Sequence, residues 1–110
     1  MSLHDLDFER GQRFEKRIWA TLKKPINYVE NQGLREFFLV AEFTKSKLSL
    51  SDDSVAIILL SCFGGRASLF KVQILQNLTF KFFVASLDVG FAIYNEGNII
   101  NQLFSLSFWL

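Results

Sequence analysis

Residues 68–86 contain the pattern that most constrains the fold. In the sequence SLFKVQILQNLTFKFFVAS, apolar and polar side chains alternate on both sides of a tight turn at Gln76 and Asn77. Alternation with a period of two predicts the two strands of a hairpin, each with one buried face. The residues predicted to face inward are Phe70, Val72, Ile74, Phe80, Phe82 and Val84. Because a hairpin with one apolar face is not stable alone, the flanking segments must cover it.

Two further segments alternate in the same way. Residues 35–45 (REFFLVAEFTK) and residues 99–110 switch between apolar and polar positions, which predicts two more strands. Their side chains predicted to face the core are Phe37, Leu39, Ala41, Phe43, Phe104, Leu106, Phe108 and Leu110. On the outer face of the last strand the pattern places Trp109.

Two segments between these strands predict helices. Ser51 can cap a helix over residues 52–63 that ends at Gly64 and Gly65, and Ser86 can cap a second helix that ends within residues 95–98. The order is then strand, helix, strand, strand, helix, strand, which is the ferredoxin-like arrangement. We expect an α+β sandwich over residues 34–110. It has a four-stranded antiparallel sheet with the first and third strands central and both helices on one face.

Residues 1–33 form a basic helical arm and linker in this interpretation. Apolar residues at helical spacing predict a helix over residues 5–23, which Pro25 ends, and residues 25–34 read as the linker. The apolar stripe of this helix consists of Phe14, Ile18, Trp19 and Leu22. Residues 9–24 contain six basic and two acidic side chains. Either this basic surface contacts an acidic partner or a phosphate backbone, or the apolar stripe docks on the domain and the charges are solvated.

The composition excludes several classes of protein. One cysteine, Cys62, and one histidine, His4, exclude a disulfide within the chain and argue against a zinc site built from this chain alone. The net charge of +1 differs from that of a strongly basic nucleic-acid binder. The sequence contains neither a secretory signal nor an apolar run long enough to span a membrane. We therefore expect an intracellular protein, nuclear or cytoplasmic, without a metal or membrane partner.

Catalytic side chains are not evident in the sequence. Cys62 lies in an apolar helical run with no second histidine to activate it. Asp52 and Asp53 are explained by the capping of a helix, and the sequence around Gly64 and Gly65 lacks the spacing of a phosphate-binding loop. We expect a non-enzymatic protein that needs no cofactor.

The helix-free face of the predicted sheet is the candidate binding surface. Modules of this topology that recognise RNA stack bases on aromatic side chains of the central strands and contact phosphates with basic ones. The residues predicted to contact RNA or single-stranded DNA are Phe38, Lys71, Lys81, Phe83, Arg13, Lys16 and Arg17. The third strand lacks the glycines of the consensus motif of such modules. The alternative is that the N-terminal helix or a second chain covers Phe38, Val40 and Phe83.

Several apolar segments, in their order along the chain, resemble a plant protein family. The segments are residues 37–43, 54–65, 70–72, 80–82 and 89–94. The family is a domain of unknown function abundant in grass genomes. It is related to the plant transposon-associated domain that precedes a CCHC zinc knuckle in gag-like proteins. The resemblance covers about residues 35–110 and implies nucleic-acid binding or assembly in a protein derived from a mobile element. It implies no catalytic residue, and because this sequence lacks the knuckle it implies no zinc site here.

Three functional hypotheses follow from the sequence. The first is weak, sequence-tolerant nucleic-acid binding on the open sheet face. The second is a protein–protein or self-association module that pairs through this face or through the edge strands. The third is a truncated relic without a specific function, because the sequence ends inside a predicted strand.

Overall fold

The computed structural model describes residues 2–28 and 36–110. Within these residues the α-helices are α1 (Glu9–Leu22), α2 (Asp52–Phe63) and α3 (Leu87–Tyr94). The strands are β1 (Phe37–Ser46), β2 (Gln73–Gln76), β3 (Thr79–Val84), β4 (Ile99–Ile100) and β5 (Phe104–Trp109). Two short 3-10 helices, η1 (Leu3–Asp5) and η2 (Ala67–Phe70), complete the list. Residues 29–34 of the predicted linker and residue 35 of the first predicted strand lie outside the described residues.

The strands form one antiparallel sheet in the order β2-β3-β1-β5-β4. The predicted α+β class is confirmed, but the prediction of four strands is wrong because the sheet has five. The segment 99–110 divides into two strands at Asn101. Its side-chain Oδ1 accepts hydrogen bonds from the backbone N–H of Leu103 at 2.8 Å and of Phe104 at 3.0 Å. This turn ends β4 and brings β5 back alongside it, with Ile99 opposite Leu106.

The first strand of the hairpin is shorter than predicted. Residues 67–70 form η2, and Lys71 has a positive φ of 50° that interrupts the extended backbone. The turn lies at residues 77–78, one residue later than predicted, and Asn77 also has a positive φ. Phe70 is buried as predicted. Ile74 lies opposite the buried Phe80 and so on the predicted face, but it is 56% exposed, so its predicted place in the core is wrong.

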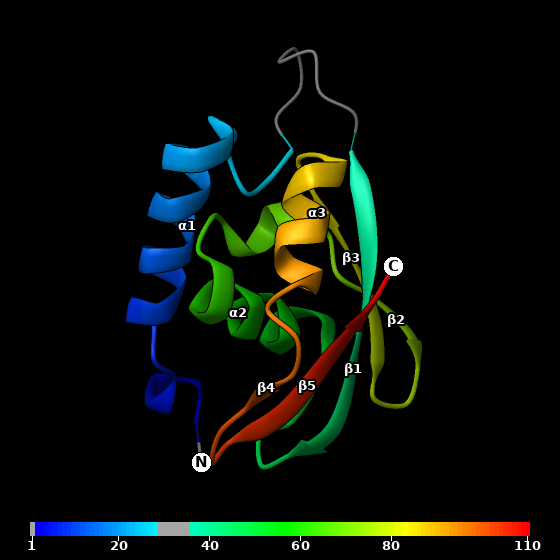
Figure 1. Cartoon of the computed structure of the whole chain (residues 1–110). Coiled ribbons are helices and arrows are strands. Elements are labelled where there is room, and N and C mark those ends of the chain that lie inside the picture. The colour runs from blue at the N-terminus through cyan, green and yellow to red at the C-terminus, as the bar shows by residue number, and fades with distance from the viewer. Residues whose placement is uncertain (1, 29–35) are drawn as a thin grey trace.

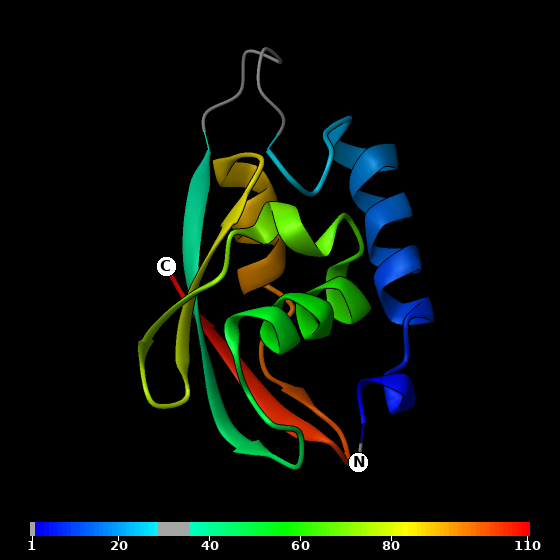
Figure 2. The same ribbon diagram turned by 180° about the vertical axis from the view of Figure 1, so that it is seen from behind.

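Three layers make up the molecule, as Figure 1 shows. The sheet forms one outer layer, α2 and α3 cover one of its faces, and α1 lies on the outer side of these two helices. The view from behind shows the same order of layers (Figure 2). The predicted inward residues that are buried between the sheet and its helices are Leu39, Ala41, Phe43, Phe80, Phe82, Val84, Phe104, Leu106 and Phe108. Leu110 is 54% exposed, so its predicted core position is wrong.

Helix α1 packs on α2 through a narrow stripe. Phe14 and Ile18 are buried, and the ring centroid of Phe14 lies 5.0 Å from that of Phe63 on α2. Gly11 permits the close approach of the two backbones, since a Cβ atom there would lie only 2.7 Å from the backbone nitrogen of Gly64. Trp19 is 58% exposed and does not dock with the stripe as predicted. It follows Ile18 directly and therefore points about 100° away around the helix.

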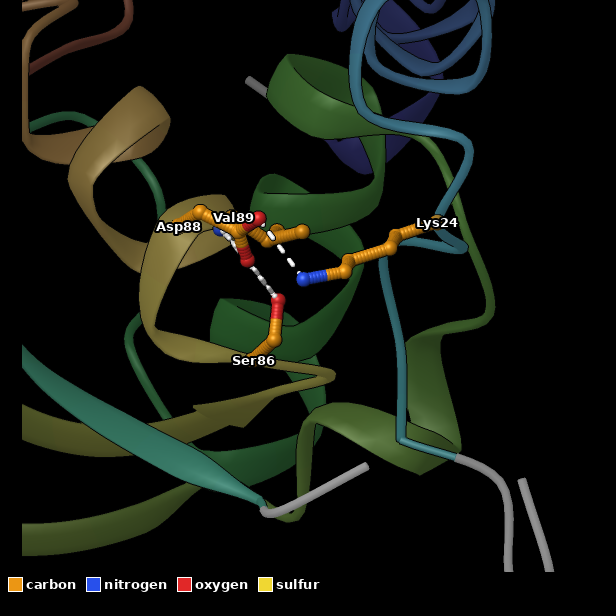
Figure 3. A network of polar contacts seen from close by, with 4 residues as sticks. All are labelled: Lys24, Ser86, Asp88 and Val89. Carbon is orange, nitrogen blue, oxygen red and sulfur yellow. Dashed lines mark hydrogen bonds and ion pairs between the residues drawn. The ribbon is translucent and has the colours of Figure 1, made fainter. Parts of the chain in front are cut away.

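The segment after α1 is fastened to the start of α3 (Figure 3). Lys24 Nζ lies 2.7 Å from Asp88 Oδ2, and the hydroxyl of Ser86 donates a hydrogen bond to Asp88 Oδ1. The backbone N–H of Val89 donates to Ser86 Oγ at 3.4 Å and to Asp88 Oδ1 at 3.2 Å. The hydrogen bonds from Lys24 and Ser86 lower the pKa of Asp88 below its usual value. This network fixes the end of the arm to the helix layer, away from the open face of the sheet.

Candidate nucleic-acid interface

The face of the sheet opposite α2 and α3 is uncovered by the described residues. Strand alternation aims the side chains of Phe38 and Val40 to this face from β1, and those of Lys81 and Phe83 from β3. Phe38 is 45% exposed. The alternative prediction that the N-terminal helix covers this face is wrong, because α1 lies beyond the helix layer (Figures 1 and 2).

Phe38, Lys81 and Phe83 form a cluster on the open face, where β1 begins and β3 ends. The rings of Phe38 and Phe83 lie opposite each other in the ladder, with centroids 6.0 Å apart and planes tilted by 57°. Lys81 Nζ lies 4.4 Å from the Phe38 centroid and 5.1 Å from the Phe83 centroid. An ammonium group at this distance is attracted to ring faces. The ammonium group of Lys81 therefore lies against both rings.

Trp109 extends this aromatic surface onto β5. Val40 lies opposite Lys81 on one side and opposite Trp109 on the other, so the three residues form a row across the sheet. The indole side chain is 55% exposed. The sequence pattern placed Trp109 on an outer face but not in the site. Only the pairing of β5 with β1 brings it beside the predicted residues.

One acidic side chain shares the open face. Glu42 lies two residues beyond Val40 on β1, opposite Thr79 on one side and Ser107 on the other. It is half-buried, and it has no hydrogen bond or ion pair with any residue in the described ranges. The bulge after Phe43 places Lys45 opposite Ser105, on the same face and next to Glu42. The face therefore has two positive side chains, Lys81 and Lys45, on either side of the negative Glu42, and it is not a strongly basic surface.

Lys71 makes a separate set of contacts. It follows η2, and its Nζ lies 2.8 Å from Glu36 Oε2 and 5.8 Å from the ring centroid of Tyr28. These contacts hold the ammonium near the start of β1. The predicted grouping of Lys71 with Lys81 on one phosphate-binding surface stays a prediction.

The three basic residues predicted on the arm lie on α1, on the far side of the helix layer from the open face (Figure 2). Arg17 lies 3.4 Å from Glu96, and Arg13 lies 3.6 Å from Glu9. Lys16 is exposed. The fold thus brings together Phe38, Lys81 and Phe83 and separates them from Arg13, Lys16 and Arg17.

Cys62 is buried at the base of a cavity of about 550 Å³ between the N-terminal segment and the β4–β5 turn. Burial raises the pKa of its thiol to about 11, so the thiol stays protonated at neutral pH. Two acidic side chains that line the cavity are used locally, since Asp5 accepts from the N–H of Ser2 and Asp7 from that of Glu9, each at 3.0 Å. The cavity therefore lacks an activated nucleophile.

The described residues lack two other kinds of feature. Among residues 2–28 and 36–110, no group of three histidine, cysteine or acidic side chains could hold a metal ion. In the same ranges, no helix is long and apolar enough to cross a membrane.

Comparison with known proteins adds no assignment. No family model matches the chain. No curated protein and no solved structure matches it either. The resemblance to the plant transposon-associated domain stays a prediction from the sequence segments alone.

Proposed function

We propose that this protein is a non-enzymatic binding module whose open sheet face binds single-stranded nucleic acid by base stacking. The observation that carries the proposal is the uncovered aromatic face, with Phe38 and Phe83 on adjacent strands around Lys81 and with Trp109 next to them. Stacking on aromatic side chains is tolerant of sequence, because every base has a π-face.

The proposal includes a finer description of the fold. We assign β1-α2-β2-β3-α3-β5 as a ferredoxin-like core to which β4 is added as an edge strand. The order β2-β3-β1-β5 within the sheet and the packing of α2 and α3 on one face support this assignment. RNA-recognition modules of this topology use aromatic side chains of their central strands. The derivation from a plant mobile element rests on the sequence resemblance alone.

The charge of the face predicts weak binding. Lys81 and Lys45 are its cations, and Glu42, which lies between them on the same face, repels phosphates. If one or two phosphates are neutralised, the logarithm of the binding constant falls with the logarithm of salt concentration with a slope of roughly −0.7 to −1.4. Most of the binding free energy then comes from stacking, which contributes about 1–3 kcal/mol per base.

Fluorescence anisotropy with a labelled oligothymidylate and oligouridylate at low salt tests the proposal. Phe83→Ala is expected to weaken binding by about 1–3 kcal/mol. The matched control is Phe91→Ala, because Phe91 is an exposed aromatic residue on α3, away from the sheet face. Binding absent from the wild type at low salt contradicts the function, and equal losses in the two variants contradict the site.

A further inference from the structure

The open sheet face has a second feature that a nucleic-acid platform does not need. We propose that this face also pairs with the open face of a second copy of the chain, so that Lys81 of each copy lies against Glu42 of the other. The proposal goes beyond nucleic-acid binding and does not depend on it. The two occupants compete for the same side chains.

Charge complementarity favours a second copy as the occupant. Lys81 contacts only ring faces in the described structure, and Glu42 has no charged or hydrogen-bonded partner among the described residues. The pair of Lys81 and Glu42 is complementary to itself, whereas a polyanion meets repulsion at Glu42. Lys45, opposite Ser105, is a further cation of the face and lies outside this pair. Opposite charges across an interface also fix its register.

Symmetry lets one contact satisfy both copies. In a two-fold interface, if Lys81 of one copy contacts Glu42 of the other, then Glu42 of the first copy also contacts Lys81 of the second. Lys81 and Glu42 lie on adjacent strands and two residues apart along them, so they are separated by about 8 Å diagonally. A two-fold axis that lies between the two sheets can place Lys81 of each copy over Glu42 of the other. The strands of one copy then cross those of the other at a steep angle. This is one of the two ways in which sheets pack face to face.

The apolar side chains around this charge pair supply the remaining contact. Phe38, Val40, Phe83 and Trp109 surround Lys81 and would be removed from water. The three strands β3, β1 and β5 present roughly 400 Å² of flat area per copy, which gives about 1,000 Å² in total with side chains. That total lies at the low end of specific interfaces, so we expect a weak dimer in rapid exchange.

Sedimentation equilibrium of the full chain over a wide concentration range, without nucleic acid, tests the pairing by charge reversal. The wild type is expected to dimerise with a dissociation constant of roughly micromolar to a hundred micromolar. Glu42→Lys and Lys81→Glu are each expected to weaken dimerisation at least tenfold. The double variant Glu42→Lys/Lys81→Glu is expected to return close to the wild-type constant, because the pair is restored with its charges exchanged. Lys16→Glu is the control, since Lys16 lies on α1.

A wild type that stays monomeric at millimolar concentration overturns the proposal, and so does a double variant no better than the single ones. Circular dichroism shows whether each variant folds. If a reversal unfolds the chain, Glu42→Gln and Lys81→Met replace it, and each must weaken the dimer if the pair forms.

Glu42→Lys also separates this proposal from nucleic-acid binding. The substitution is expected to weaken the dimer and to strengthen binding of an oligothymidylate, because it adds a cation to the face. A dimer without nucleic-acid binding leaves self-association standing and removes the proposed function. A monomer that binds nucleic acid supports the proposed function and overturns self-association. A monomer that does not bind nucleic acid overturns both proposals.

Discussion

The crossing of α1 over α2 can be tested at a single atom. Gly11 lies on α1 where the helix meets the end of α2. A Cβ atom at this position would lie 2.7 Å from the backbone nitrogen of Gly64 and 2.8 Å from the carbonyl oxygen of Ser61. Both neighbours belong to the backbone, so no side-chain rotation relieves the clash. Gly11→Ala must therefore push α1 away from α2.

The cost of this displacement follows from the contacts that it opens. Phe14 and Ile18 pack on α2 in the same stripe and are buried. A gap of 0.5–1 Å forfeits about a quarter to a half of the dispersion attraction across it, and overpacking costs about 1–3 kcal/mol. Alanine returns about 1 kcal/mol through its helix propensity. Taking the upper part of the overpacking range, we expect a net loss of about 2 kcal/mol.

Urea unfolding followed by circular dichroism measures this loss. With an m-value of about 1.5 kcal/mol/M, a loss of about 2 kcal/mol lowers the midpoint by roughly 1.3 M. Gln12→Ala is the control, because Gln12 is an exposed neighbour on the same helix, and its effect should stay within about 0.5 kcal/mol. A Gly11→Ala protein as stable as the wild type would refute the close crossing and with it the position of the arm on the helix layer.

Three further perturbations test the packing around the site. Cys62, buried with a pKa of about 11, is expected to react with a thiol reagent at pH 8 only as fast as the chain opens, so stoichiometric labelling within seconds in native buffer would contradict its burial. Asp88 has a pKa lowered by its hydrogen bond from Lys24, so its contribution to stability is present above the unfolded pKa of about 4 and is lost as the pH falls through the lower folded value. Lys24→Met should therefore lose less stability than the wild type between pH 5 and pH 2, and identical profiles of unfolding free energy would count against the pair. Ser51→Ala removes the acceptor of the Ser54 N–H, 3.1 Å away, and should cost about 1 kcal/mol; Ser51→Asp keeps an acceptor, and equal losses in the two variants would refute the cap.

The sequence predicted most elements because local patterns determine them. Serine caps and glycine stops bound α2 as expected, from Ser51 to Gly64. Alternation identified the buried faces of β1, β3 and β5. The errors arose where local pattern and tertiary packing disagree. Ile74 continues the alternation of Phe70 and Val72 as a buried residue would, yet it lies on an edge strand and is exposed.

The division of the last segment into two strands was missed for a related reason. Clear alternation is confined to residues 104–110, and the adjacent apolar residues Ile99 and Ile100 do not continue it. The turn is fixed by the hydrogen bonds that Asn101 makes with the backbone of Leu103 and Phe104. An asparagine alone in such a segment is a weak signal, because its side chain also suits a solvent-exposed strand position.

The sequence predicted the part of the candidate site that depends only on the pairing of β1 with β3. Phe38 and Phe83 meet because β1 and β3 are adjacent, which the order of elements predicts. The positions of Lys71 and of the basic residues on α1 depend on how η2 and α1 pack, which no sequence pattern specifies. Trp109 was missed as a site residue because its place beside Val40 follows from the register of β5 against β1.

The two tryptophans provide the most direct test of the open sheet face as the binding surface. Trp109 lies on this face and Trp19 lies on α1, and their side chains are 55% and 58% exposed. Their indole N–H signals can be followed in one NMR titration of ¹⁵N-labelled protein with an unlabelled oligothymidylate. The proposed function predicts that the Trp109 signal shifts with the amides of Phe38, Lys81 and Phe83, while the Trp19 signal stays in place. A shift of the Trp19 signal alone, or no shift of either signal, would contradict it.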